Sequence, residues 1–136
     1  GRLTQSHMDV LGVYGILPES PLFEKKNMQQ TFDWVWDNWN WNATWGWDFP
    51  MTAMCAARLG NPEKAVDALL MDVQTNTYLV NGHNYQNGGL RIYLPGNGGL
   101  LTAVAMMAAG WDGAEGNAPG FPAYWNVKYE NLNKMP

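Results

Sequence analysis

Helical segments of two kinds alternate along this 136-residue chain. Residues 8–17, 50–59 and 100–109 are apolar or small almost all round, and a helix of that kind must be surrounded by protein. Between them, residues 21–39 and 62–72 carry apolar side chains on one face and charged or amide side chains on the other. The predicted order is therefore buried, amphipathic, buried, amphipathic, buried.

Residues typical of helix ends separate these segments. Pro18 stops the first segment, and Ser20 followed by Pro21 is predicted to cap and begin the second. Gly60 ends the third segment in the left-handed position, and Asn61 caps the fourth. The turns from a buried to an amphipathic helix are therefore short.

Alternation of buried and half-exposed helices is what a helical toroid requires, with the buried helices forming an inner ring. We predict an all-α fold that makes about half of a six-plus-six toroid. Residues 1–110 form its C-terminal helices, and residues 111–136, rich in Gly, Pro and Asn, form an irregular tail packed on them. The open side of such a half is apolar, so we expect the remainder of the parent chain or a complementary chain to cover it.

The long connections, residues 40–49 and 73–99, both lead from an amphipathic to a buried helix. They therefore fall at the same end of the molecule, next to the N-termini of the buried helices. Loops of this length in a compact domain are usually functional. We predict the functional site at this end.

Tryptophan is the unusual part of the composition. The chain has eight Trp residues, and six of them lie between Trp34 and Trp47. Indole faces pack protein cores, and they also stack on the apolar C–H faces of sugar rings. The net charge is −4 with no cluster of Lys and Arg, which argues against nucleic-acid binding.

Other features exclude further classes of protein. No apolar run reaches the roughly 18 residues of a membrane span, so no membrane association is predicted. The single Cys55 excludes a disulfide within the chain and indicates a buried packing thiol. Two His and one Cys, far apart in sequence, make no ligand set, so we predict no metal and no cofactor.

Three stretches carry a family resemblance: Ser6-His7-Met8 with Leu11-Gly12 and Tyr14-Gly15; Gly46-Trp47 with Ala57-Arg58-Leu59-Gly60 and Glu63-Lys64-Ala65; and Gly96-Asn97-Gly98-Gly99. In this order and spacing they resemble segments of the six-hairpin glycosidases. These (α/α)6-barrel enzymes include the inverting α-L-fucosidases and the family 65-type hydrolases and phosphorylases. The resemblance covers roughly residues 6–110. It implies attack on a glycosidic bond by an activated water or phosphate, with a carboxylic general acid.

The chain also departs from the fucosidase-like pattern. Pro95 stands where that pattern has the Asp that activates the base, and Asp48 stands where it has a Ser after Gly-Trp. The general acid of these enzymes lies in the first half of the barrel, upstream of the matched stretches. The resemblance therefore implies the scaffold and the general chemistry, but not specificity for fucose.

Asp48 is the candidate catalytic carboxylate. It lies between the indoles of Trp45 and Trp47 and the start of a buried helix, where desolvation shifts the pKa of a carboxyl. Inverting hydrolysis needs two carboxyl groups, and Asp48 is the one acid in the predicted loops that fits. The alternative is that Asp48 caps the helix, accepting backbone N–H groups just before Pro50.

The predicted substrate-binding residues supply indoles, amides and imidazoles: Trp45, Trp47, His83, Asn84, Tyr85, Gln86, Asn97 and His7. Neutral His and amide side chains offer both donors and acceptors, which suit sugar hydroxyls. Packing is the alternative for the tryptophans, and we expect it for most of the others, from Trp34 to Trp41. His7 as a structural residue, Asn97 as a helix cap and residues 81–86 as a plain surface loop are further alternatives.

We interpret the chain as the C-terminal portion of a glycoside hydrolase that acts on a neutral glycan. The missing N-terminal Met and the abrupt entry into a buried helix suggest a piece of a longer protein. We expect a bacterial protein of the periplasm or the extracellular space. The rival hypotheses are a non-catalytic carbohydrate-binding helical module and a structural subunit of a larger complex.

Overall fold

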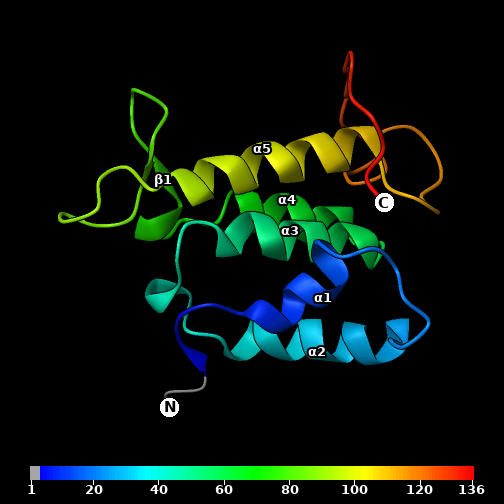
Figure 1. Cartoon of the computed structure of the whole chain (residues 1–136), viewed down its shortest axis with the longest axis horizontal. Coiled ribbons are helices and arrows are strands. Elements are labelled where there is room, and N and C mark those ends of the chain that lie inside the picture. The colour runs from blue at the N-terminus through cyan, green and yellow to red at the C-terminus, as the bar shows by residue number, and fades with distance from the viewer. Residues whose placement is uncertain (1–3) are drawn as a thin grey trace.

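The computed structural model describes residues 4–136 and is mostly helical, with one small antiparallel pair of strands (Figure 1). The α-helices are α1 (Gly12–Gly15), α2 (Lys25–Asn38), α3 (Asp48–Arg58), α4 (Pro62–Leu69) and α5 (Leu94–Ala109). The 3-10 helices are Asp9–Leu11, Trp41–Ala43 and Gln74–Asn76, and the strands are β1 (Thr77–Tyr78) and β2 (Asn84–Tyr85). The helical content agrees with the predicted class, whereas the strand pair was not predicted. The first three residues of the predicted domain lie outside the described range.

Helix α3 is the centre of the molecule. Every residue from Asp48 to Arg58 is buried, and the helix packs against α1, α4 and α5. Its small side chains at Ala53, Ala56 and Ala57 let the neighbouring helices approach closely. The prediction that this segment is buried all round is confirmed.

Helices α2 and α4 cover the core from outside. Met28, Phe32 and Val35 are the buried residues of α2, at the spacing of one helix face. Lys64 of α4 joins the two helices, because its Nζ lies 3.8 Å from Asp33 Oδ1 and 4.9 Å from the centroid of the Trp36 ring. Both predicted amphipathic helices therefore form, each with one face exposed.

Two predicted boundaries are wrong because local turns end or delay the helix. The first segment forms only the 3-10 helix Asp9–Leu11 and α1, not a helix through residue 17. The second begins at Lys25, and Ser20 is not its cap. The Ser20 hydroxyl instead accepts the N–H of Leu22 at 3.3 Å, and its carbonyl accepts the N–H of Phe23 at 3.1 Å. This local bonding of a serine favours a turn over a helix.

Helix α5 begins at Leu94, six residues before the predicted start, and contains all of Gly96–Gly99. Asn97 therefore lies inside the helix and is not its N-cap. Glycine disfavours helix by about 1 kcal/mol per residue, which is why the sequence predicted a loop here. Close contacts favour the glycines in this helix: a Cβ at Gly99 would lie 2.8 Å from Pro50 Cγ, and one at Gly96 would overlap Asn84.

One side of α5 faces away from the rest of the described chain. Leu101 is 73% exposed, and Leu94 and Val104 are also exposed. On the other side, Ala103, Met106 and Met107 are buried in the core. The prediction that α5 is surrounded by protein is therefore wrong within residues 4–136, where its outer side is an exposed apolar surface.

The C-terminal segment after α5 packs back onto the helices without forming a helix of its own. Gly120 donates its N–H to the Met107 carbonyl at 2.9 Å, and Trp111 pairs with Met135 in an isolated bridge. In Figure 1 this tail lies at one end of α5 and the loops around β1 lie at the other. Within residues 4–136, no helix has the length and apolar character needed to cross a membrane.

Candidate functional site

The two long loops meet at the N-terminal end of α3, as predicted. Gly46 in the first loop donates its N–H to Gln86 Oε1 in the second at 2.9 Å. Gln86 returns a bond from Nε2 to the Thr44 carbonyl at 3.3 Å. The buried Gln86 side chain therefore joins the two loops, because its amide accepts one backbone hydrogen bond and donates another.

Asn84 fixes the same junction from the strand pair. Its side chain is fully buried, and Nδ2 donates to the carbonyls of Thr75 and Thr77 at 3.1 Å each. A Cβ at either Gly46 or Gly96 would overlap this side chain, so both glycines are needed for the approach. In this structure Asn84 is packed between the loops and α5 and does not reach solvent.

Asp48 lies directly behind these loops and is 0% exposed. Its Oδ2 accepts the N–H of Trp45 at 2.8 Å, and its Oδ1 lies 3.5 Å from the N of Met8. The Trp45 carbonyl in turn accepts the N–H of Asp48 at 3.0 Å. Asp48 thus reaches back to a preceding N–H, as the acid of a capping box does, but the return bond comes from the Trp45 backbone carbonyl and not from a side chain. The expected N-cap role, with acceptance from residues ahead of it, is wrong.

Burial raises the pKa of the Asp48 carboxyl above its ordinary value. The N–H of Trp45 and the nearby His7 act in the opposite direction, because they favour the charged form. The cost of desolvation outweighs them. Asp48 is therefore a carboxyl that holds its proton more tightly than an exposed aspartate.

His7 connects Asp48 to the surface. Its Nδ1 lies 3.3 Å from Asp48 Oδ2 and accepts the indole N–H of Trp47 at 2.6 Å. Indole nitrogen is a donor only, so this bond requires an Nδ1 without a proton, and the neutral ring carries its hydrogen on Nε2. Nδ1 has a single lone pair, so a protonated Asp48 can donate to it only in competition with the Trp47 indole. The His7 side chain is 34% exposed, in contrast to the covered carboxyl.

Aromatic rings surround His7. The ring centroids of His7 and Trp45 are 5.6 Å apart, and those of Trp45 and Tyr93 are 5.5 Å apart. Burial raises the pKa of the Tyr93 phenol, and the nearby Asp48 raises it further, so the phenol stays neutral. Tyr93 was not predicted, because one tyrosine in a long loop gives no periodic or motif signal.

A cleft of about 400 Å³ lies beside Trp45. Amide and hydroxyl side chains form most of its lining: Asn42, Thr44, Gln74, Thr75, Gln86 and Asn87. Among residues 4–136, no ionisable side chain lines it. The Thr75 hydroxyl is buried and has no hydrogen-bond partner among the described residues. The cleft therefore combines an indole wall with uncharged donors and acceptors.

The remaining predicted residues lie farther from this cluster. Asn97 accepts the N–H of Asn84 at 2.9 Å and donates to the Gly82 carbonyl at 2.8 Å, so it holds the loop onto α5. His83 has a buried Nδ1 with no partner in the described part of the chain, and Tyr85 pairs with Thr77 in the strand pair. Within residues 4–136, no hydrogen bond or ring contact joins His83 or Tyr85 to Trp45.

The other tryptophans of the aromatic run mostly pack, as expected. Trp36 stacks on Phe32 at 5.8 Å, and Trp41 contacts Phe49 at 6.0 Å between ring centroids. Trp34 differs, because it is 53% exposed on the outer face of α2. The tryptophans between Trp34 and Trp47 therefore differ in location: some lie in the core, one on the surface and others in the loop.

Neither a known protein family, nor a curated protein, nor a solved structure matches this chain.

Proposed function

We propose that this chain is the C-terminal part of a glycoside hydrolase and binds a neutral glycan in the cleft beside Trp45. The observation that carries the proposal is the lining of that cleft, where an indole meets amides and hydroxyls without any ionisable side chain. A charged ligand would find no counter-ion there. A neutral polar ligand would find donors, acceptors and one apolar wall.

Sugar rings fit this combination of groups. Each hydroxyl both donates and accepts, and the side chains of Asn42, Gln74 and Asn87 offer both functions as well. The C–H face of a pyranose stacks on an aromatic ring, and Trp45, which Tyr93 contacts at 5.5 Å between ring centroids, supplies that ring in the lining of the cleft. Sugar units bound in this cleft would extend over His7, since its ring lies next to Trp45.

The acid–base chemistry is assigned to Asp48 acting through His7. Asp48 is covered and the His7 side chain is 34% exposed, so a proton exchanged with the ligand passes through the imidazole. His7 Nε2–H gives its proton to the ligand while Nδ1 takes one from the Asp48 carboxyl, in place of the bond from the Trp47 indole. Inversion needs a second carboxyl group on the other side of the glycosidic bond. The cleft has no carboxylate in its lining, so we assign that group to another part of the parent protein.

The scaffold of the proposal is an (α/α)6 toroid, as in the six-hairpin glycosidases that the sequence resembles. The packing of α1 and α5 on either side of α3, with α2 and α4 outside, supports an inner and an outer ring. The exposed apolar side of α5, with Leu94, Leu101 and Val104, is the surface on which the next helices of the ring would pack.

Turnover of neutral oligosaccharides by the protein that contains this chain tests the proposal. We expect the released sugar to have the inverted anomeric configuration. Proton NMR of the product, recorded before mutarotation, measures that configuration. Asp48→Asn and His7→Gln should each reduce kcat by about 100-fold or more, since loss of acid–base catalysis has that size. Asp37→Asn, an exposed carboxylate on α2, is the matched control and should leave kcat unchanged. Equal turnover in all three variants would contradict the assigned chemistry.

A non-catalytic carbohydrate-binding module is the second candidate. The covered Asp48 carboxyl and the uncharged lining of the cleft favour it, since binding needs neither a free acid nor a base. If the chain is such a module, we expect the parent protein to bind saccharides without turning them over. Asp48→Asn would then change binding little, whereas Trp45→Ala would abolish it.

A further inference from the structure

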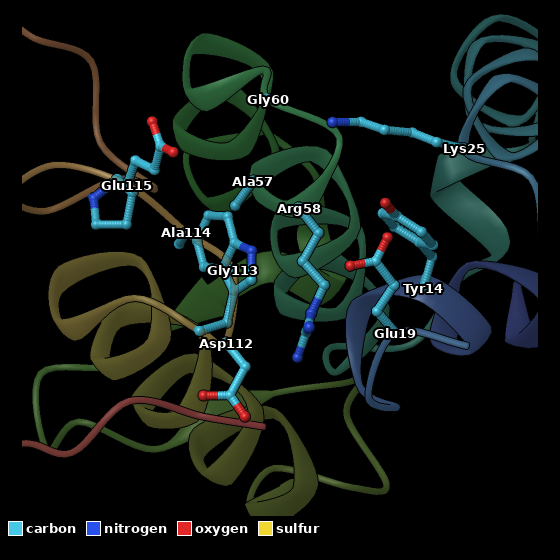
Figure 2. Close-up of a pocket in the computed structure, with 12 residues that line it drawn as sticks. Tyr14, Glu19, Lys25, Ala57, Arg58, Gly60, Asp112, Gly113, Ala114 and Glu115 are labelled. Carbon is cyan, nitrogen blue, oxygen red and sulfur yellow. The ribbon is translucent and has the colours of Figure 1, made fainter. Parts of the chain in front are cut away.

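A second cavity, of about 290 Å³, lies at the opposite end of α3 around Arg58 (Figure 2). At 1.5 Å per residue, the eleven-residue helix places Arg58 about 15 Å from Asp48 along its axis. The residues of this cavity come from α1, the start of α2, the end of α3 and the segment after α5. It shares none of them with the cleft beside Trp45.

Arg58 is only 7% exposed and lines this cavity. Its Nε donates to the Gly15 carbonyl at 3.2 Å and its Nη2 to the Pro136 carbonyl at 2.7 Å. Its Nη1 makes no hydrogen bond within the described part of the chain, and no Asp or Glu side chain described there lies within 4.0 Å of the guanidinium. A guanidinium carries five N–H donors and these two bonds use two of them, so donors remain for a ligand in the cavity.

Groups of both signs surround Arg58. Figure 2 shows Tyr14 and Glu19 on one side of Arg58, and Asp112 and Glu115 on the other. Lys25 completes the charged groups of the lining, and Trp111 adds an indole. Three carboxylates against two cations give this cavity a formal charge of −1. Donors and acceptors therefore alternate around one small space with an aromatic side chain.

We infer that this cavity binds one neutral sugar residue. An anion would find Arg58 and Lys25 but would face three carboxylates, and a cation would face the guanidinium. A polyol has neither conflict, because each hydroxyl accepts from Arg58 while it donates to Glu19, Asp112 or Glu115. Bonds to charged groups of this kind are about twice as strong as those between neutral groups. The volume is at the lower end of ligand pockets, about 300 Å³, which suits a single ring.

The inference does not depend on the proposed function, because the two sites share no residue. It assigns to the chain a separate site that anchors a glycan away from the cleft. The carboxylates of Asp112 and Glu115 are on exposed residues, so they can be changed without disturbing the core.

An NMR titration of the full chain with methyl glycosides of glucose, galactose, mannose and fucose tests this inference. The ¹H–¹⁵N signals of the tryptophan indoles report the binding. We expect at least one glycoside to shift the Trp111 indole signal saturably. The double variant Asp112→Asn with Glu115→Gln should bind it roughly tenfold more weakly, since charge-assisted bonds become neutral. Asp37→Asn is the matched control and should bind as the unchanged chain does.

Trp45→Ala separates this site from the cleft, because it should leave the Trp111 response intact even if the cleft binds nothing. The inference is overturned if no glycoside shifts Trp111. It is also overturned if only acetate or glycine does, since the cavity would then select an anion or a zwitterion.

Discussion

The two ends of α3 bury an acidic and a basic side chain in different surroundings. Asp48 lies in the first turn and Arg58 in the last, and each is more than nine-tenths buried. Both positions suit the helix dipole, which favours a negative group at the N-terminus and a positive one at the C-terminus. Yet the cleft beside Trp45, at the Asp48 end, has no charged lining, whereas the cavity at the Arg58 end is lined by five charged side chains.

This difference shows how one helix supports two kinds of polar site. At the first end, the backbone N–H groups of Trp45 and Met8 face the Asp48 carboxyl. The described lining of the adjacent cleft contains no charged side chain. At the second end, backbone carbonyls of Gly15 and Pro136 meet the guanidinium, and charged residues remain around it. Neither end relies on a buried Asp–Arg pair, so each can be changed separately.

The largest expected effect comes from Gly46→Ala at the first end. The new Cβ would overlap Asn84 and lie 2.9 Å from the Thr75 carbonyl, so the two loops must separate. We expect a loss of about 3 kcal/mol in the free energy of unfolding, measured in urea, and loss of glycan binding. Gly88→Ala is the matched control, because nothing lies within 4 Å of its Cβ. Equal stability of the two variants would show that the loops are not locked together.

The next effect contrasts two substitutions of Asp48. Asp48→Ala leaves the N–H of Trp45 without its acceptor, and we expect it to lower the free energy of unfolding by about 2 kcal/mol. Asp48→Asn keeps an oxygen for that N–H and replaces the ionisable carboxyl by a neutral amide of the same shape, so its effect should stay within about 1 kcal/mol. Thermal and urea unfolding of both variants measure this. A larger loss in the Asn variant would mean that the charge itself stabilises the fold.

At the second end, Arg58→Lys should lower the free energy of unfolding by about 1 kcal/mol. The ammonium keeps the charge but cannot reach both carbonyls with the planar geometry of the guanidinium. Lys25→Met, at an exposed position of the same cavity, should change stability by less than about 0.5 kcal/mol. If both variants behave alike, the two carbonyl bonds of Arg58 contribute nothing.

The smallest expected effect is a pH dependence at the first end. The folded pKa of Asp48 is raised by burial, so the folded state binds this proton more tightly than the unfolded state does. Stability from this group is present below its ordinary pKa and is lost as the pH rises through the folded pKa. The difference in free energy of unfolding between the unchanged chain and Asp48→Asn should therefore fall over that window, measured by urea unfolding at several pH values. A rise would show that interactions with His7 and Trp45 outweigh desolvation.

Patterns that extend over many residues predicted three of the helices well, although the apolar patterns of residues 8–17 and 100–109 misjudged the length of the first segment and the burial of α5. The uniform apolar character of residues 50–59 predicted the buried α3, and the 3.6 period predicted α2 and α4. The lengths of the two long connections predicted that their loops meet at one end. These features follow from periodicity and connectivity, which a single sequence contains.

Details set by contacts between distant residues were not predictable. Gly96–Gly99 belongs to α5 because Asn84, Pro50 and Trp47 pack against it, and glycine propensity alone predicts a loop. Asp48 reaches back to Trp45 and across to His7, forty-one residues away, so its role depends on tertiary structure. Arg58 and Tyr93 stand in ordinary sequence surroundings, and only the fold places them at a site.

The most direct test of the central claim is calorimetric titration of the chain with neutral oligosaccharides, comparing Trp45→Ala with Trp34→Ala. Both indoles belong to the same aromatic run, but Trp45 lines the cleft and Trp34 lies exposed on α2. The account predicts saturable binding that Trp45→Ala abolishes and Trp34→Ala preserves. Binding that survives the loss of Trp45, or disappears equally with Trp34, would contradict a glycan site in the cleft beside Trp45.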